Sequence, residues 1–314
     1  MPASFVSRWE RSAAGCGVGT EIRMPTDQVE RPLKLALPKG RMQEGIFRLF
    51  TEAGISVRSD SRGYRPQISL PGVDAKILKP QNVVEMLQAG SRDVGFAGAD
   101  WVRELNADLV DVLDTGLDPV RLVAAAPAQL LINGALPKRP IVVASEYERI
   151  TREWIASRDL RATFVRSYGA TEVFPPEDAD CIVDVAASGE TLRAQNLIVF
   201  DELMRSSTRL YANPRALKDP GTKAAIDRLV LLLKSVLEAR QRVMLEVNVT
   251  AADLERVIAA LPCMREPTIS QLHGGAGYAV KAAVPRSRLP LVIPEIKARG
   301  GTDVIVTQPI QIIP

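Results

Sequence analysis

The sequence predicts an α/β fold followed by a smaller ferredoxin-like βαββαβ unit. Short apolar runs typical of strands alternate with helical patterns from Leu33 to Ala212, and strands separated by helices are typical of parallel sheets. From Met244 onward the order becomes strand, helix, strand, strand, helix, strand within about 70 residues, which is the ferredoxin-like arrangement. A hydrophobic content of 46% and a charged content of 25% are ordinary for a globular chain, and 314 residues suffice for two or three domains.

The first part opens with a strand at Leu33–Leu37 and a helix that runs from Met42 to a stop signal at Gly54. Pro80 opens a second helix, because proline fits the first helical position, and this helix ends at Gly90. Apolar patterns predict a helix at Ser145–Ser157 and strands at Ala75–Leu78, Asp93–Ala97, Arg121–Ala126, Ile141–Ala144, Thr163–Val165, Cys181–Ala186 and Thr208–Ala212. In parallel sheets of this kind, ligands sit at the carboxyl ends of the strands.

The last third begins with a strongly apolar helix at Asp227–Arg242, which we expect to be a packing spine or a linker. Thr250 and Asp253 have the spacing of a capping box before the next helix. The other predicted elements are strands at Met244–Val249, Thr268–Leu272, Tyr278–Val284 and Asp303–Thr307 and a helix at Leu291–Arg299. Since this unit carries no catalytic constellation of its own, we expect a regulatory or oligomerising module.

Composition excludes several classes of function. The net charge of +3 is too small to favour nucleic-acid or membrane binding by bulk electrostatics, and no apolar run approaches the roughly 20 residues of a membrane span. The cysteines, Cys16, Cys181 and Cys263, lie far apart like free thiols of a reducing compartment, so we expect a cytoplasmic protein. His273 is the only histidine, which excludes multi-histidine zinc sites and His-based triads and favours chemistry by positioning, charge and Mg2+.

Residues 1–31 form a separate segment. They mix Ser, Ala, Gly, Arg and Pro without periodicity, and they lack the apolar centre of a secretory signal. We expect a disordered extension without function.

A strand, a turn of small residues and a helix start follow one another between Asp180 and Leu192, and this is the most informative motif of the chain. The apolar run Cys181–Ala186 predicts a buried strand, which breaks at Ser188-Gly189 before a helix that begins at Glu190. Free backbone N–H groups and the positive end of a helix bind phosphate in such motifs.

The side chains of this motif suit a phosphorylated sugar. Gly189 leaves room by lacking a Cβ, and the hydroxyls of Ser188 and Thr191 are further donors. The one acid of the strand, Asp184, can hold a sugar hydroxyl or a Mg2+-bound water. The same pattern also fits a helix that Ser188 caps, with Asp184 in a turn, so the local sequence alone leaves both interpretations open.

Two other polar motifs lie at the ends of predicted strands. Lys39-Gly40-Arg41 follows the first strand, and the stretch Asp93–Asp100 contains another strand and its end. Because three motifs share this placement, a ligand site gains support over a capped helix. The alternatives are that Lys39–Arg41 is solvated surface and that Asp93 and Asp100 are helix caps.

The chain resembles the long form of the ATP phosphoribosyltransferase family, which carries a C-terminal regulatory domain. The resemblance covers roughly Leu33 to Ile313 and rests on specific motifs: Leu35–Arg41, Ile77–Val83, Asp93–Trp101, Glu172, Ala179–Asp184, Ser188–Leu192 and Leu261–Thr268. It implies an enzyme in which N1 of ATP attacks C1′ of phosphoribosyl pyrophosphate, so that pyrophosphate leaves and phosphoribosyl-ATP forms. This is the first step of L-histidine biosynthesis, it requires Mg2+, and L-histidine inhibits it.

The resemblance also implies roles for individual residues. Ser188, Gly189, Glu190, Thr191 and Leu192 would cradle the 5-phosphate of phosphoribosyl pyrophosphate. Asp184 would bind the ribose hydroxyls, directly or through Mg2+, and would be the metal residue and one of the catalytic residues. ATP would contact Lys39, Gly40, Arg41, Asp93 and Arg121, of which Lys39 and Arg41 would be catalytic by neutralising phosphates. Thr268 and His273 would belong to the regulatory histidine site.

The architecture implied is a catalytic part of two α/β lobes, of the periplasmic-binding-protein type, and a C-terminal ferredoxin-like (ACT-like) domain. The chain would cross between the lobes twice. Lobe I would comprise residues 32–125 and 206–228, lobe II residues 126–205, and the regulatory domain residues 229–314. Homo-oligomers, dimers or hexamers, are implied by the family as well.

Two rival functions fit parts of the sequence. A binding protein without turnover would have the same α/β pattern, but it would not need both the Ser188–Thr191 loop and Lys39–Arg41. A phosphoribosyltransferase with a nucleobase acceptor usually has two adjacent acids before its loop. Here Asp184 stands alone, which favours ATP as the acceptor.

Overall fold

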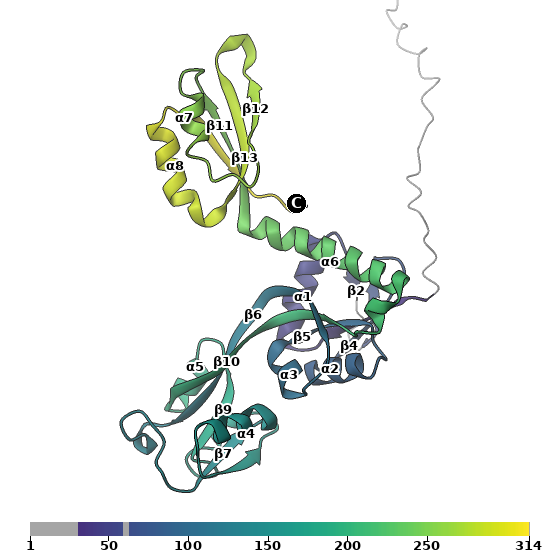
Figure 1. Cartoon of the computed structure of the whole chain (residues 1–314), viewed down its shortest axis with the longest axis vertical. Coiled ribbons are helices and arrows are strands. Elements are labelled where there is room, and N and C mark those ends of the chain that lie inside the picture. The colour runs from purple at the N-terminus through teal and green to yellow at the C-terminus, as the bar shows by residue number, and fades with distance from the viewer. Residues whose placement is uncertain (1–30, 59–62, 314) are drawn as a thin grey trace, which may run out of the picture.

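The computed structural model describes residues 31–58 and 63–313 and consists of two α/β lobes, a long helix and a separate C-terminal domain (Figure 1). The predicted extension 1–31 lies outside the described residues except for Arg31. The mixed α/β class with a separate C-terminal sheet confirms the fold predicted from the sequence.

Lobe I is a parallel half-sheet with the strand order β4-β1-β5, and its apolar strands pack against helices. Its core contains Leu35, Ile46, Phe50 and Phe96, all fully buried, because the apolar faces of β1 and α1 point to one another. Its elements are β1 (Leu33–Pro38), α1 (Arg41–Glu52), β2 (Val57–Arg58), β3 (Gln67–Ile68), β4 (Val73–Leu78), α2 (Pro80–Gln88), β5 (Val94–Gly98) and α3 (Ala99–Glu104).

Lobe II repeats this plan with the parallel order β9-β7-β8. Its elements are η1 (Ala128–Leu130), β7 (Ile141–Ser145), α4 (Glu148–Ser157), β8 (Ala162–Arg166), η2 (Thr171–Val173), β9 (Cys181–Ala186) and α5 (Glu190–Ala194). The helix predicted from Ser145 begins three residues later, because Ser145 ends strand β7 and its hydroxyl donates to the carbonyl of Val183 on β9 at 2.6 Å.

Two long antiparallel strands, β6 (Val110–Pro127) and β10 (Leu197–Ala212), join the lobes into one eight-stranded sheet. Strand β10 pairs antiparallel with β5 of lobe I, and β6 pairs antiparallel with β9 of lobe II. The parallel pairing that the sequence predicts is present within each lobe, and the antiparallel ribbon that joins the lobes was not predicted. The expected lobe boundaries, 125/126 and 205/206, fall inside these two strands.

Helix α6 (Pro220–Gln241) leads from lobe I to the C-terminal domain, as Figure 1 shows, and follows the turn η3 (Ala216–Lys218). It begins earlier than the sequence pattern predicts, because Asp219 accepts a hydrogen bond from the backbone N–H of Thr222 at 2.9 Å and Pro220 occupies the first turn. Its buried Leu229, Leu233 and Val236 belong to the core of lobe I, so the helix is a spine of that lobe as well as a connection.

The C-terminal domain has the predicted ferredoxin-like topology, an antiparallel sheet in the order β12-β13-β11-β14. Buried and half-buried residues alternate along β11, since one face of the sheet is covered by α7 and α8 and the other is not. Thr250 and Asp253 bond to one another in a turn just before α7. The elements are β11 (Arg242–Val249), α7 (Leu254–Ile258), β12 (Thr268–Gln271), η4 (His273–Gly275), β13 (Tyr278–Pro285), η5 (Arg286–Arg288), α8 (Leu289–Ala298) and β14 (Thr302–Thr307).

After β14 the chain returns to helices α6 and α1. The backbone N–H of Ile312 donates to the carbonyl of Ser235 on α6 at 2.9 Å, and the amide of Gln311 donates to the carbonyl of Glu52 on α1 at 3.3 Å. Arg240 of α6 also pairs with the Glu52 carboxylate at 2.9 Å. Among the described helices, none is long and apolar enough to cross a membrane.

Candidate active site

The predicted phosphate motif forms an open loop between β9 and α5. Gly189 adopts a left-handed conformation with φ 75° and ψ 11°, which glycine tolerates and other residues disfavour. A Cβ at this position would meet nothing within 4 Å, so here the glycine serves the backbone conformation. The Ser188 hydroxyl accepts a weak hydrogen bond of 3.4 Å from the N–H of Glu190, and Thr191 is exposed.

This loop borders a cavity of about 220 Å3. Its lining includes Glu172, Asp184 and the whole run from Ala186 to Leu192. Leu192 differs from its neighbours, because its side chain is buried in the core of lobe II beside Leu197. It anchors the loop, and only its backbone is available to a ligand.

Asp184 is a partly buried carboxylate, and the one hydrogen bond that stabilises its negative charge comes from the backbone N–H of Val185. Burial, together with the charges of Glu172 and Glu146, raises the pKa of Asp184 to about 6, although a hydrogen bond from the N–H of Val185 acts in the opposite direction. A raised pKa of this origin means that a cation near Asp184 would be favourable.

A second cavity, of about 180 Å3, lies between the lobes and shares Val185 with the first. Lys39 and Arg41 line it from lobe I, Tyr147 lines it from lobe II, and Thr208 lines it from the ribbon. The Lys39 ammonium lies 4.9 Å from the ring centroid of Tyr64 and 3.2 Å from its hydroxyl. The structure thus brings the cationic loop and the phosphate loop to adjacent cavities.

Several residues of the cleft were not predicted from the sequence as site residues. The Tyr147 hydroxyl donates to Asp100 at 2.7 Å, and Ser206 both donates to Asp100 at 2.5 Å and accepts from its backbone N–H at 3.1 Å. Trp101 stacks on Tyr147 with ring centroids 4.6 Å apart. In the sequence, Tyr147 belongs to the apolar pattern of a predicted helix, which indicates a core residue. Its position shortly after a buried strand is the only sequence signal that places it near the cleft.

Glu104 makes a further connection between the lobes. It closes α3 of lobe I, and its two carboxylate oxygens accept from the backbone N–H groups of Arg149 and Ile150 at 3.0 Å each. These groups open α4 of lobe II, where the helix dipole favours a negative charge. Glu104 is only 8% exposed, so the lobes meet here through a buried, charged cap.

Three predicted ATP-binding residues, Asp93, Arg121 and Gly40, do not line the two cavities, although Gly40 lies between the lining residues Lys39 and Arg41. Asp93 lies at the amino end of β5, where it is buried, accepts from the N–H of Lys34 at 2.8 Å and pairs with Arg31. Arg121 pairs with Glu202 on the ribbon at 3.4 Å. Neither residue lines the two cavities of the cleft.

The predicted regulatory residues lie in the C-terminal domain. Thr268 begins the edge strand β12, and His273 begins the turn η4 that follows it. Both side chains are exposed in this chain. The structure places them at opposite ends of one strand.

A magnesium site can be tested against the residues present. In the described part of the chain, no group of three or more His, Cys, Asp or Glu side chains could hold a metal by itself. Mg2+ commonly binds one or two carboxylates together with substrate phosphates and water. The buried charge of Asp184 beside the phosphate loop fits that mode of binding.

The two lobes, the cleft and the ferredoxin-like module define a two-lobed α/β protein with an attached C-terminal domain. The family model of ATP phosphoribosyltransferase matches residues 79–235, and the model of the family's C-terminal domain matches residues 239–311. The chain belongs to the ATP phosphoribosyltransferase family, in its long form, which confirms the resemblance seen in the sequence.

Similar proteins carry the same description. An ATP phosphoribosyltransferase from Pelotomaculum thermopropionicum is 34% identical over 287 residues, which cover 90% of this chain and 99% of the relative. One from Pelodictyon phaeoclathratiforme is 33% identical over 283 residues, covering 88% and 96%. A chain in the solved structure of the ATP phosphoribosyl transferase (HisG:HisZ) complex from Thermotoga maritima is 25% identical, with a TM-score of 0.59, covering 66% of this chain and 98% of that one.

Proposed function

We propose that this transferase moves the phosphoribosyl group of phosphoribosyl pyrophosphate to N1 of ATP, giving phosphoribosyl-ATP and pyrophosphate. The family supports the first step of L-histidine biosynthesis as its reaction. The observation that carries the detailed proposal is the pair of adjacent cavities that share Val185, one bordered by the phosphate loop and the other by Lys39 and Arg41.

The phosphoribosyl donor occupies the cavity of lobe II in this proposal. The loop from Ser188 to Leu192 offers backbone N–H groups and the hydroxyls of Ser188 and Thr191 to the 5-phosphate. Asp184 holds the ribose hydroxyls, directly or through Mg2+. Bound Mg2+ would supply positive charge to the pyrophosphate group, and it would also lower the pKa of Asp184.

ATP occupies the cavity between the lobes. Lys39 and Arg41 line this cavity and provide the cations that its phosphates, or the departing pyrophosphate, require, and Gly40 links these two residues in the same loop. Trp101 and Tyr147 provide an aromatic wall for a planar base. Attack at C1′ needs no protein nucleophile, since the leaving group is already good, so catalysis consists of orienting N1 and stabilising charge.

The C-terminal domain is the site of inhibition by L-histidine in this proposal, with Thr268 and His273 at the effector site. Their exposure in a single chain supports a site that a second copy completes, in keeping with the homo-oligomer, a dimer or hexamer, that the family resemblance implies. A cytoplasmic location is in keeping with a biosynthetic role and with the free thiols of Cys181 and Cys263.

Release of pyrophosphate from ATP and phosphoribosyl pyrophosphate tests the reaction. We expect Mg2+-dependent turnover that L-histidine reduces. Turnover with a free nucleobase but not with ATP would establish the rival nucleobase transferase, and binding without turnover would establish a sensor. An unchanged rate with L-histidine would remove the regulatory role alone.

Thr191→Ala tests the phosphate loop. The lost hydroxyl should raise the apparent KM for phosphoribosyl pyrophosphate more than the KM for ATP, because Thr191 lines only the donor cavity. Thr307→Ala, at an exposed position of β14, is the control and should change neither KM. Equal increases for both substrates in Thr191→Ala would argue against a phosphate cradle.

A further inference from the structure

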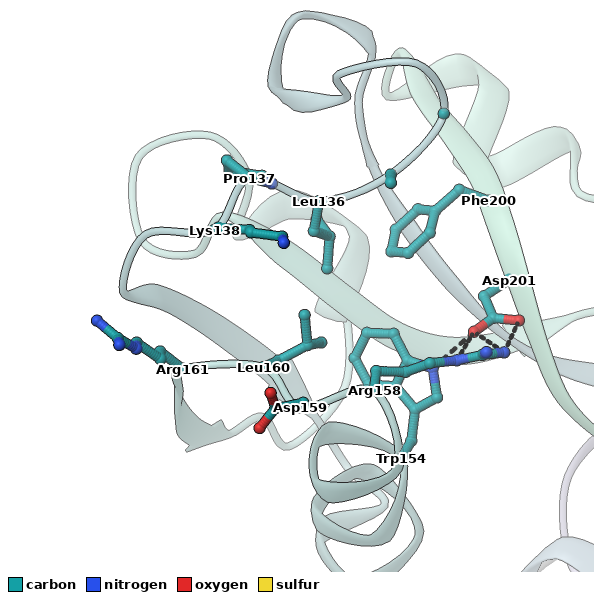
Figure 2. Close-up of a pocket in the computed structure, with 12 residues that line it drawn as sticks. Leu136, Pro137, Lys138, Trp154, Arg158, Asp159, Leu160, Arg161, Phe200 and Asp201 are labelled. Atoms are coloured by element: carbon teal, nitrogen blue, oxygen red, sulfur yellow. Dashed lines mark hydrogen bonds and ion pairs between the residues drawn. The ribbon is translucent and has the colours of Figure 1, made fainter.

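A third cavity lies in lobe II and is larger than either cavity of the cleft, at about 800 Å3. It shares no lining residue with the two cavities of the active site. Its walls come from the loop at residues 134–138, from the end of α4 with the following residues to Arg161, and from Phe200 and Asp201 of β10 (Figure 2). Its size is within the range of small-molecule pockets, which is about 300–1,000 Å3.

The wall of this cavity combines charged side chains with an apolar group that contains two aromatic rings. Leu136, Leu160, Trp154 and Phe200 gather around its centre in Figure 2. The rings of Trp154 and Phe200 are tilted against each other at 51°, with centroids 6.2 Å apart. A concave wall of this kind favours a ligand with a flat apolar body.

The polar groups beneath that wall already have partners. Asp201 accepts hydrogen bonds from the indole N–H of Trp154 at 2.8 Å and from two nitrogens of Arg158 at 2.9 Å each. These bonds compensate the charge of Asp201 and fix the indole ring. Because the side chains of this wall are already ordered in the free protein, binding of a ligand costs less conformational entropy.

The remaining charge favours an anion. Lys138 extends its ammonium toward Leu136 over the cavity, whereas the Arg161 guanidinium points outward (Figure 2). No described residue forms a hydrogen bond or an ion pair with Lys138. With Arg158 paired to Asp201, Lys138 and Arg161 outnumber the one other acid of the lining, Asp159.

We propose that this cavity is a second ligand site, which takes a small planar aromatic molecule bearing an anionic group. The ring packs against Trp154, Phe200 and Leu160, and the anion pairs with Lys138. The site is separate from the substrates of the transferase, and its occupation does not depend on the reaction proposed above.

1-Naphthoate is a suitable probe, and calorimetric titration of the full chain is a suitable measurement. We expect naphthoate to bind at millimolar concentrations or below and about fivefold more tightly than the neutral 1-naphthalenemethanol, which is the range of one exposed charge pair. Saturating ATP should leave naphthoate binding unchanged. Displacement by ATP would place the probe in the cleft and overturn the proposal.

Lys138→Met keeps an unbranched side chain that is one atom shorter and removes its charge. It should lower the affinity for naphthoate to that for the neutral alcohol, leave binding of the alcohol unchanged and leave turnover unchanged. Lys297→Met, at an exposed position of α8, is the matched control and should alter nothing. An absence of naphthoate binding, equal binding of both probes to the natural chain, or an unchanged naphthoate affinity in Lys138→Met would each refute the site.

Discussion

The hydroxyl of Tyr147 in lobe II donates a 2.7 Å hydrogen bond to the carboxylate of Asp100 in lobe I, at the centre of the cleft. Ser206 of the ribbon donates to the other oxygen of the same carboxylate. All three residues are buried, and burial beside Asp100 raises the pKa of the Tyr147 hydroxyl far above its usual range. The contact therefore ties both lobes and the ribbon between them to one carboxylate.

Tyr147→Phe tests this contact, because it removes only the hydroxyl. Asp100 loses one of its two side-chain donors in a buried place, so unfolding free energy should fall by about 1–3 kcal/mol. Tyr278→Phe is the control, since no described residue bonds to the Tyr278 hydroxyl, and it should change stability by less than about 0.5 kcal/mol. Urea unfolding measures both, and equal losses would show that the interlobe bond contributes nothing.

Glu104→Gln tests the cap on α4. One of its two carboxylate oxygens becomes an amide nitrogen, so either Arg149 or Ile150 loses the acceptor of its backbone N–H. We expect a loss of about 1–2 kcal/mol and faster hydrogen exchange at these two amides. Glu255→Gln, exposed on α7, should leave exchange unchanged. Exchange rates at residues 149 and 150 that matched the natural protein would contradict the cap.

Gly189→Ala tests the conformation of the phosphate loop. With φ at 75°, an alanine is strained by about 1–2 kcal/mol although space is available for its Cβ. The loop should then relax, and the KM for phosphoribosyl pyrophosphate should rise. Gly221→Ala is the matched control, because its Cβ would make an ordinary contact of 3.8 Å, and stability should stay constant or rise by up to about 1 kcal/mol. A Gly189→Ala enzyme with unaltered KM would show that the loop binds nothing.

Asp184→Asn tests the buried charge. The pKa of Asp184 is about 6 in the folded chain and near its ordinary value when unfolded, so the folded state holds the proton more tightly. Stability should therefore fall by about 2–3 kcal/mol as the pH rises from about 4 to 6, and level off above. In Asp184→Asn this fall should be absent, and the variant should be inactive yet more stable at pH 8. Parallel stability curves for the two proteins would refute the assignment.

Local sequence predicted the elements well wherever the pattern was complete. The bounds of β9, Cys181–Ala186, agree with the sequence pattern because an apolar run ends there in small residues. In contrast, the sequence predicts only the apolar ends of β6 and β10. Their middle parts carry polar residues such as Asp114 and Ser207 and several register shifts, which obscure the alternation of a strand.

The parts of the site that were missed depend on distant contacts. Asp100 and Tyr147 stand 47 residues apart in the sequence, and no local pattern indicates that α3 and the start of α4 meet across the cleft. The stretch Asp93–Asp100 is a second case in which the local sequence did not tell which residue belongs to the site. It spans a whole strand, so one acid lies at each end of the sheet, and only Asp100 enters the cleft.

The return of the chain after β14 has a mechanical consequence. A domain joined by helix α6 alone could swivel about the helix end, but the bonds of Ile312 to Ser235 and of Gln311 to Glu52 add a second point of attachment. The C-terminal domain is thus attached at two points, through α6 and through the contacts of the last residues with α6 and α1. With two attachments, the domain moves most readily by bending about the line that joins them. A force on the C-terminal sheet would therefore be transmitted to α1. Because α1 begins at Arg41, the force would also reach the Lys39–Arg41 loop.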